Sequence, residues 1–210
     1  MHWDGSVRGT SFTDLTGNGF SGALTGNWAM STGVVGDAMV ADGSTTWASA
    51  DPGEPQTWTI SQWVRADSLP SGYNAYIASI GSGPVFWTGW GVLLGGDGRI
   101  GAYAQSGVSS QEQVLWSEET CVGGWTHVVA TWEAGTLRIY LDGALASSLS
   151  PGFTTILYGA NDFFLGNDPN QPFRLLHAGV DEVMLWDARL SDEEVGQLFE
   201  DGACHRETAY

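Results

Sequence analysis

Residues 124–149 alternate between apolar and polar side chains with a period of two, which is typical of β-strands with one buried face. The segment reads GWTHVVATWEAGTLRIYLDGALASSL, and a Glu-Ala-Gly turn and an Asp142-Gly143 turn divide it. Asp-Gly is a two-residue hairpin turn whose twist suits paired antiparallel strands. In the second strand, Leu137, Ile139 and Leu141 alternate with polar positions that include Tyr140, which we expect to face solvent. The segment therefore predicts three consecutive antiparallel strands.

The same alternation recurs along the chain, between clusters of Gly, Asn, Asp and Ser that are typical of turns. The ranges that we predict as strands are 2–7, 20–25, 35–40, 44–48, 56–66, 75–81, 85–94, 98–104, 112–116, 125–132, 136–141, 144–149, 161–165 and 174–187. One helix is predicted near the C-terminal end, where Ser191 is a good N-cap and Glu194 completes a capping box. An apolar stripe of Val195, Leu198 and Phe199 follows. The pattern predicts an all-β sandwich with one short C-terminal helix lying on it.

Composition is consistent with one domain spanning residues 1–210. The chain has 210 residues, of which 42% are hydrophobic, so a single core is large enough to stabilise it. We find no internal repeat and no low-complexity linker. The 30 glycines suit many tight turns, and the 11 tryptophans suit an aromatic core, a carbohydrate-binding surface, or both.

The chain is strongly acidic, and this limits its partners. Its formal net charge is −17, and its seven basic residues are all arginine. A phosphate backbone or an anionic lipid surface would be repelled, so we expect no nucleic-acid partner, and no apolar run predicts membrane insertion. The same acidity raises the local concentration of cations and favours divalent ions where carboxylates and carbonyls converge. It also suits solubility in a salty external medium.

Cys121 and Cys204 are the two cysteines of the chain, which are too few for a zinc site. They are either two free thiols or one disulfide that would tie the C-terminal tail to the loop before Trp125. A disulfide requires an oxidising compartment. No secretory leader is recognisable, but Met1 stands directly before the first predicted strand, as it would in a chain trimmed from a longer secreted precursor. We expect an extracellular or cell-surface location and the disulfide Cys121–Cys204.

Five segments, in order and spacing, resemble the concanavalin A-like laminin G and pentraxin superfamily. They are DLTGNGFSGAL (14–24), WTISQWVRAD (58–67), GWTHVVATWEAGTLRIYLDGAL (124–145), FFLGND (163–168) and VDEVMLWDARLSDEEV (180–195). The resemblance spans nearly the whole chain and is closest to laminin G-like modules of large extracellular bacterial proteins. It implies a jelly-roll sandwich of two antiparallel sheets, in agreement with the strand pattern.

The resemblance also implies a structural calcium ion, because members of this superfamily commonly hold one where the N-terminal turn meets the last long strand. The matching positions are Asp14, Gly17, Asn18 and Asp181. Calcium prefers six to eight oxygen ligands, which carboxylates and the carbonyls of a Gly-rich turn supply. The alternative is that Asp14 and Asn18 form an Asx-type turn and Asp181 ends a sheet edge. Glu182 alternates to the face opposite Asp181, so we expect at most one of these two acids to bind the ion.

A second calcium site, as in pentraxins, would involve Asn74 and the segment 167–171. Asp168 is the only acid in that segment, so a plain Asn-Asp-Pro-Asn turn explains the sequence better.

The candidate ligand surface consists of aromatic and amide residues near predicted loops, because sugar rings stack on aromatic side chains and amides and carboxylates bind their hydroxyls. The candidates are Tyr73, Asn74, Tyr76, Trp87, Trp90, Tyr158, Asn161, Asn167 and Asp168. The tryptophans in strongly alternating strands are expected in the core instead: Trp58, Trp63, Trp125, Trp132 and Trp186.

The sequence does not favour an enzyme, although the superfamily includes glucanases. Retaining glycosidases need two carboxyl groups about 5 Å apart, which a strand supplies with acids at i and i+2, and no such strand pattern occurs. Glu118 and Glu119 are adjacent and face opposite sides, and we expect His127 to be a packed residue. We therefore predict a non-catalytic, lectin-like, calcium-binding extracellular module that recognises a glycan or glycosylated protein, as part of a larger protein. The alternatives are a structural or adhesive protein-binding module and, less favoured, a polysaccharide-degrading enzyme.

Overall fold

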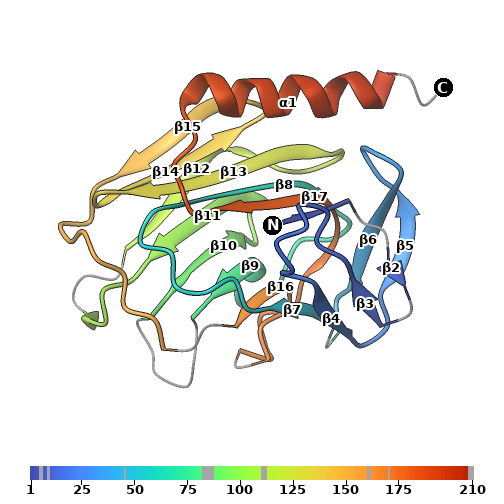
Figure 1. Ribbon diagram of the computed structural model, residues 1–210, viewed down its shortest axis with the longest axis horizontal. Coiled ribbons are helices and arrows are strands. Elements are labelled where there is room, and N and C mark those ends of the chain that lie inside the picture. Colours follow the sequence, from blue (N-terminus) through green and yellow to red (C-terminus); the bar gives the residue numbers. More distant parts are fainter. Residues whose placement is uncertain are drawn as a thin grey trace.

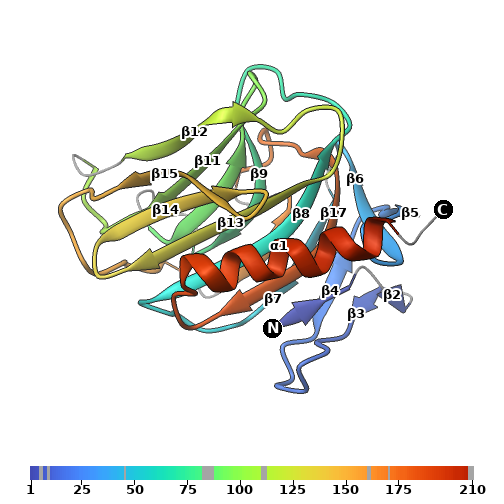
Figure 2. The same ribbon diagram turned by 90° about the horizontal axis from the view of Figure 1, so that it is seen from above.

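The structure is a computed structural model that describes residues 1–4, 7–8, 10–44, 46–81, 88–109, 113–159, 162–169 and 171–207. In this part of the chain two β-sheets lie face to face, and one helix lies across the outer side of one of them (Figures 1 and 2). All strand pairings in the described part of the chain are antiparallel. The predicted all-β sandwich with one C-terminal helix is confirmed.

Sheet A carries the helix on its outer face. Its strands, in spatial order, are β15 (Ala144–Leu149), β14 (Thr136–Leu141), β13 (Thr126–Glu133), β8 (Trp58–Ala66), β17 (His177–Trp186), β6 (Asp37–Asp42) and β5 (Ala29–Thr32), and β1 (His2–Trp3) also pairs with β17. The order of sheet B is β12 (Val114–Thr120), β11 (Arg99–Ala104), β10 (Trp90–Leu94), β9 (Ala75–Ile80), β16 (Phe163–Gly166), β7 (Trp47–Ala50), β4 (Gly22–Thr25), β3 (Ser11–Phe12) and β2 (Val7–Arg8).

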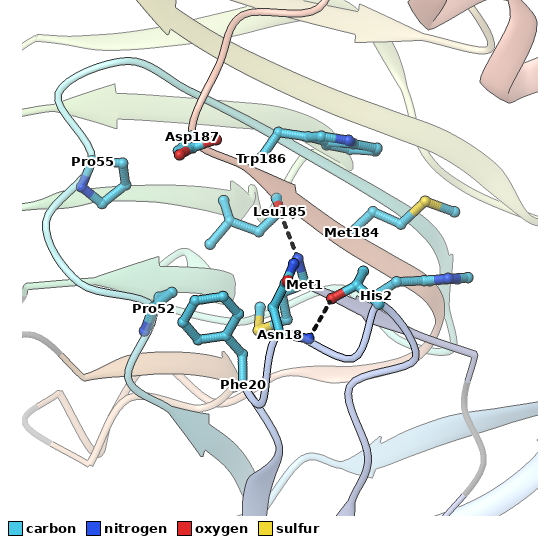
Figure 3. A pocket seen from close by; sticks show the side chains of 11 residues that line it. Met1, His2, Asn18, Phe20, Pro52, Pro55, Met184, Leu185, Trp186 and Asp187 are labelled. Carbon is cyan, nitrogen blue, oxygen red and sulfur yellow. Dashed lines mark hydrogen bonds between the residues drawn. The ribbon is translucent and has the colours of Figure 1, made fainter.

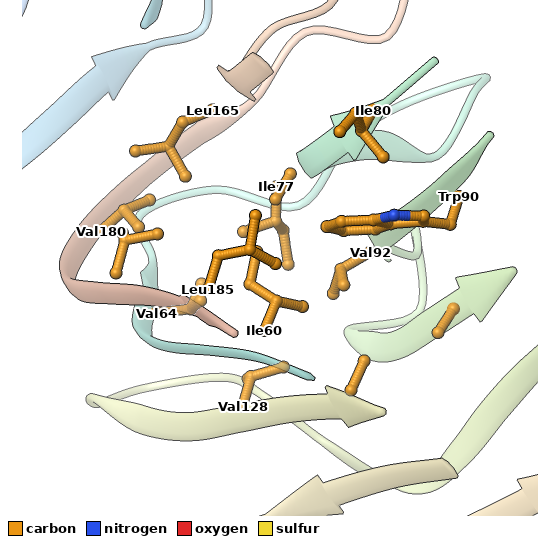
Figure 4. Packing of buried hydrophobic residues seen from close by; sticks show 14 of the residues in the cluster. Ile60, Val64, Ile77, Ile80, Trp90, Val92, Val128, Leu165, Val180 and Leu185 are labelled. Atoms are coloured by element: carbon orange, nitrogen blue, oxygen red, sulfur yellow. The ribbon is translucent and has the colours of Figure 1, made fainter. Parts of the chain in front are cut away.

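The hydrophobic core fills the space between the sheets. Ile60 and Val64 from sheet A face Ile77 and Val92 from sheet B, and all four side chains are fully buried (Figure 4). The two sheets are also joined by a stacked pair of tryptophans, Trp58 and Trp90, whose ring centroids lie 4.2 Å apart. Core residues come from the first strand to the last, so distant parts of the sequence share one core.

Helix α1 (Asp192–Glu207) begins with the predicted capping box. The Glu194 N–H donates to Ser191 Oγ (3.2 Å), and Glu194 Oε2 accepts from the Ser191 N–H (2.7 Å) and its hydroxyl (2.8 Å). This reciprocal arrangement satisfies amide donors that the first helical turn leaves unpaired. The helix therefore starts where the sequence predicts.

The outer face of sheet A is covered by α1, which explains why one polar position is buried. Tyr140 was expected to face solvent, but it is fully buried beside Val129 and Val195, and its hydroxyl donates to Asp192 Oδ1 (2.8 Å). Further along the helix, a Cβ added to Gly202 would lie 2.7 Å from the ring of Trp63, so glycine permits the close approach there. The alternation of the strand was predicted correctly, but alternation alone does not show that α1 covers the outer face of sheet A.

Two strands were missed and several boundaries differ. β3 has two residues, and β5 is a largely exposed edge strand, so neither has the alternation that identifies a half-buried strand. The strand predicted at 44–48 is β7 and begins at Trp47. Of the strand predicted at 85–94, residues 90–94 form β10, and residues 82–87 lie outside the described residues.

The predicted disulfide is wrong, because both cysteines are free. Cys121 is fully buried in the core between the sheets, where burial raises the pKa of its thiol. Cys204 is exposed on α1, on the outer side of sheet A. A whole β-sheet therefore separates the two sulfur atoms.

Candidate ligand-binding surface

The outer face of sheet B carries a second aromatic cluster, apart from the main core. Ala75, Val92 and Ala102 belong to the core, and by strand alternation Tyr76, Leu93 and Tyr103 point to the opposite face. Trp116 and Val114 of the edge strand β12 pack against these three residues. Sheet B thus presents aromatic rings on the side away from the helix.

Two glycines shape this outer face. A Cβ at Gly91 would lie 2.7 Å from the ring of Tyr103, and a Cβ at Gly101 would lie 2.7 Å from the ring of Trp116. The missing side chains let both rings lie directly over the neighbouring strand. The strand sequences WGVLL and RIGAYA place these glycines, so this part of the surface is determined locally.

A polar group lies at the edge of the cluster. The Tyr103 hydroxyl donates to the Tyr76 hydroxyl at 3.4 Å, and the carboxylate of Asp168, which is fully buried, lies near enough to influence Tyr103. Burial, the neighbouring Tyr76 and Asp168 raise the pKa of Tyr103 well above its ordinary value. The hydroxyl therefore stays protonated at neutral pH and acts as a hydrogen-bond donor.

Arg174 organises the exposed part of this face. Its guanidinium carbon lies 5.8 Å from the ring centroid of Tyr73, 5.4 Å from that of Tyr76 and 5.9 Å from that of Phe173. Its Nη1 also donates to the Asn74 carbonyl at 3.3 Å. One cation thus contacts three aromatic rings, two from loops and one from strand β9.

Tyr73 and Phe173 form what we call the aromatic platform. Their ring centroids lie 4.8 Å apart, and their side chains are 59% and 51% exposed. Large exposed aromatic residues that contact each other are unusual on a free surface and are typical of binding sites. Tyr73 was predicted as a ligand residue; Phe173 and Arg174 were not, because PFR in a loop has no pattern of its own.

The other predicted ligand residues have different places. Asn74 is half-buried beside the platform, and Tyr76 is buried next to it. Asn167 is buried and its Nδ2 donates to the Ser44 carbonyl at 3.1 Å. Trp87 and Asn161 lie outside the described residues.

Two candidates belong to the core instead of the surface. Trp90 is fully buried on Trp58, because alternation in β10 turns Trp90, Val92 and Leu94 inward. Tyr158 packs against the main core, and its hydroxyl donates to the Pro55 carbonyl. Among the tryptophans expected in the core, Trp58 and Trp132 lie there, Trp63 is buried under α1, and Trp125 and Trp186 are half-buried.

Asp14 holds the N-terminal turn through its own carboxylate. Oδ1 accepts from the N–H groups of His2 (3.0 Å) and Thr16 (3.1 Å), and Oδ2 accepts from the Phe20 N–H (3.2 Å). The Thr16 hydroxyl lies 2.8 Å from both oxygens. Burial acts to raise the pKa of Asp14, but these donors outweigh it and lower the pKa below its ordinary value. This is the Asx-type arrangement that was the alternative to a calcium ligand.

Asp181 holds a different turn. Its Oδ2 accepts from the N–H groups of Val34 (2.7 Å) and Val35 (3.1 Å), and its Oδ1 accepts from the Glu182 N–H (2.9 Å). The side chain is fully buried, and this burial raises its pKa to about 6 despite the three donors. Asp181 therefore connects β17 to the turn between β5 and β6.

These contacts do not fit one calcium-binding set made of Asp14, Gly17, Asn18 and Asp181. The carboxylates accept backbone N–H groups of two separate turns, and Asn18 and Gly17 are exposed. Within the described residues, no group of three or more His, Cys, Asp or Glu side chains is arranged to hold a metal ion. Glu182 instead bonds to His2 Nε2 at 2.7 Å, next to a bulge in β17. Calcium binding therefore stays a prediction from the resemblance.

His127 is a packed residue, as expected. It is buried between Trp63 and Phe199, with ring centroids 5.0 Å and 6.1 Å away, and its Nε2 lies 2.8 Å from Ser61 Oγ. Burial lowers its pKa to about 4, so it is neutral at physiological pH. No helix among the described residues has the length and apolar character to cross a membrane.

Three comparisons place this architecture among known proteins. A family model described as the concanavalin A-like lectin/glucanases superfamily, of laminin G type, matches residues 39–196. A search of curated proteins found no significant match.

Solved structures share the fold over almost the whole chain. Domain 4 of AbnA, a GH43 extracellular arabinanase from Geobacillus stearothermophilus, in complex with arabinotriose, has a TM-score of 0.74 at 21% identity, covering 94% of this chain and 96% of that one. The binding domain of Paraclostridial Mosquitocidal Protein 1 has a TM-score of 0.74 at 15% identity, covering 95% and 51%. The botulinum neurotoxin serotype G binding domain has a TM-score of 0.75 at 16% identity, covering 95% and 50%. This chain thus spans about half the length of each toxin domain. At these identities the likeness shows a shared fold.

Proposed function

Since this chain belongs to the laminin G-type family of the concanavalin A-like lectin/glucanases superfamily, we propose that it is a non-catalytic module that binds a neutral glycan at the aromatic platform. The observation that carries the proposal is the exposed pair Tyr73 and Phe173, held at a ring distance of 4.8 Å by contacts with Arg174. Sugar rings have apolar C–H faces, which stack on such rings and gain by excluding water.

Polar groups beside the platform suit the hydroxyls of a sugar. Asn74 lies next to it, and the Tyr76 and Tyr103 hydroxyls lie deeper in the same face. Few polar groups around an apolar surface are typical of a site that orients a ligand. The net charge of −17 disfavours an acidic polysaccharide, which would be repelled before it reached the single arginine at the platform. A neutral glycan is therefore the ligand class that we propose.

The similar structures support this ligand class without fixing the sugar. The domain of the extracellular arabinanase was solved with arabinotriose, and the toxin structures are titled as binding domains. Fold alone does not determine function, so the proposal rests on the platform. By the same comparison we propose that the module is extracellular and belongs to a larger protein.

The proposal is tested by electrophoresis in gels that contain soluble neutral polysaccharides, such as arabinan, xylan and β-glucan. Wild-type protein should be retarded by at least one of them, and the double variant Tyr73→Ala with Phe173→Ala should be retarded clearly less. Leu145→Ala, which removes a side chain that is 50% exposed on the other sheet, serves as the matched control. Retardation that is equal in all three proteins would place the site elsewhere.

Calcium is a separate part of the proposal, and no step of platform binding depends on it. The resemblance predicts that a chelator lowers the unfolding temperature, because an ion that binds only the folded state stabilises it. The hydrogen bonds of Asp14 and Asp181 predict no change, since both carboxylates already have donors. Thermal unfolding with calcium and with excess chelator distinguishes these two predictions.

The structural or adhesive alternative rests on one feature, an open apolar groove lined by Val108, Phe153, Ile156 and Leu157. Val108 and Leu157 are 50% and 51% exposed. Failure of every polysaccharide to retard the protein would favour this groove as the functional surface.

A further inference from the structure

A concave site lies away from the aromatic platform, at the end of β17. It is a pocket of about 470 Å³ that we call the Trp186 pocket. Figure 3 shows Phe20 and Pro52 on one side, Trp186 and Asp187 on the other, and Leu185 between them. Its volume lies in the range of small-molecule sites, roughly 300–1,000 Å³.

The pocket walls combine apolar rings with polar side chains at the mouth. Phe20, Pro52, Pro55 and Trp186 provide the rings, and Trp186 is half-buried although its strand predicted a core position. Asn18 and Asp187 line the same pocket and are exposed. Such a lining suits a ligand with an apolar face and hydroxyl groups at its rim.

Both walls are fixed before any ligand arrives. The Phe20 N–H donates to Asp14 Oδ2 at 3.2 Å, and the Asn18 N–H donates to Thr16 Oγ1 at 3.3 Å, so the N-terminal turn is held by its own hydrogen bonds. On the other wall, Trp186 is paired with Thr59 in the ladder of sheet A. A preorganised pocket loses little conformational entropy when a ligand binds.

The charges around the pocket disfavour acidic ligands. No arginine is among the described residues that line it, and Asp187 is an exposed carboxylate. His2 is already paired with Glu182 at 2.7 Å, and the Met1 ammonium, which also lines the pocket, donates to the Leu185 carbonyl at 3.0 Å. An anion would therefore meet repulsion and no free guanidinium partner. An aliphatic ligand would make no use of the polar side chains at the mouth.

We propose that the Trp186 pocket is a second sugar-binding site, in which a neutral sugar ring stacks on Trp186 and Phe20 and its hydroxyls bond to Asn18 and Asp187. The ligand class rests on the proposed function, but the site is independent of the platform. Trp186 lies opposite Thr59, near the start of β8. Tyr73 lies in the loop that comes after β8 ends at Ala66. Nine residues of strand span about 30 Å, so the two sites sit at opposite ends of the sandwich.

This separation has a consequence for binding. One chain would contact a polysaccharide at two separate points, or bridge two polysaccharide chains. Two weak sites on one rigid body then give a higher affinity for a long polymer than for a trisaccharide, because the second contact is intramolecular.

The experiment uses the full chain labelled with nitrogen-15 and titrated with arabinotriose, xylotriose, cellotriose and laminaritriose. The indole N–H signal of Trp186 is identified by its absence in Trp186→Phe. We expect this signal to shift saturably with at least one trisaccharide, both in the wild type and in the double variant Tyr73→Ala with Phe173→Ala. The variant Asn18→Ala with Asp187→Ala changes two exposed residues, so its unfolding temperature should be unchanged, and it should weaken this response about 10-fold.

Several results would overturn the inference. Binding that depends on Tyr73 and Phe173 without a shift of the Trp186 signal would leave the proposed function intact and remove the second site. No response to any trisaccharide in any protein, and no retardation by polysaccharide, would remove both. A shift of the Trp186 signal with choline but with none of the trisaccharides would assign the pocket to an amine and refute the sugar.

Discussion

Replacing Asp181 by alanine should destabilise the protein and change the pH dependence of its stability in a defined way. In the folded state this fully buried carboxylate accepts the N–H groups of Val34, Val35 and Glu182. The variant leaves three amides without an acceptor, and each buried unsatisfied group costs on the order of 1–3 kcal/mol before water and local relaxation compensate. A net loss of about 2 kcal/mol or more at pH 7 is expected.

The pH dependence follows from the raised pKa of the same group. Burial raises the pKa of Asp181 from 3.8 to about 6, so the folded protein holds this proton at pH values where the unfolded chain has released it. The contribution of Asp181 to the unfolding free energy is therefore largest below pH 4 and is lost as the pH rises through 6. Since one pKa unit corresponds to about 1.4 kcal/mol, the loss amounts to about 3 kcal/mol.

The assay is denaturant unfolding of the wild type and Asp181→Ala at several pH values between 4 and 7, in the presence of a chelator. The wild type exceeds the variant in unfolding free energy, and this difference should decrease by about 3 kcal/mol as the pH rises from 4 to 7. Asp37→Ala, an exposed acid beside the same turn, should follow the wild type. A difference that stays constant with pH, or widens as the pH rises, would refute the account of Asp181.

Two further predictions concern α1. Ser191→Ala removes the cap that accepts the Glu194 N–H and should lower the unfolding free energy by about 1 kcal/mol in denaturant unfolding, whereas an unchanged value would show that the helix end needs no cap. Cys204→Ser should leave the unfolding temperature unchanged with or without reductant, since Cys204 is a free exposed thiol; a reductant-sensitive unfolding temperature that the substitution abolishes would restore the disulfide.

The fold could be predicted largely from the sequence because it depends on local patterns. Alternation in residues 124–149 and the Asp142-Gly143 turn predicted β13, β14 and β15, and both turn residues have the positive φ that this hairpin requires, 47° and 79°. The capping box predicted the start of α1. Tyr140 was misjudged because its burial depends on the helix, which lies 50 residues away along the chain.

The candidate site was only partly predictable. Tyr73, Asn74 and Tyr76 share a short segment, so an aromatic and amide cluster was visible there. Phe173 and Arg174 come from the connection between β16 and β17, about 100 residues later. The pairing of β16 with β9 and the hydrogen bond from the Tyr76 N–H to the Arg174 carbonyl bring the two segments together. Trp90 was misassigned because residues beside a turn can face either way, and its inward direction is set by pairing with β9 and β11.

The most direct test of the account is a calorimetric titration of the purified chain with a neutral oligosaccharide. The oligosaccharide is prepared from the polysaccharide that retards the protein in the gel experiment. A sugar that covers roughly 60 Å² of apolar surface on each platform ring gains about 1.5 kcal/mol per ring. In the Tyr73→Ala, Phe173→Ala variant the affinity of the platform site should therefore fall about 100-fold, with an unchanged unfolding temperature. Equal affinity in the two proteins would contradict the assignment of the platform as the glycan-binding site.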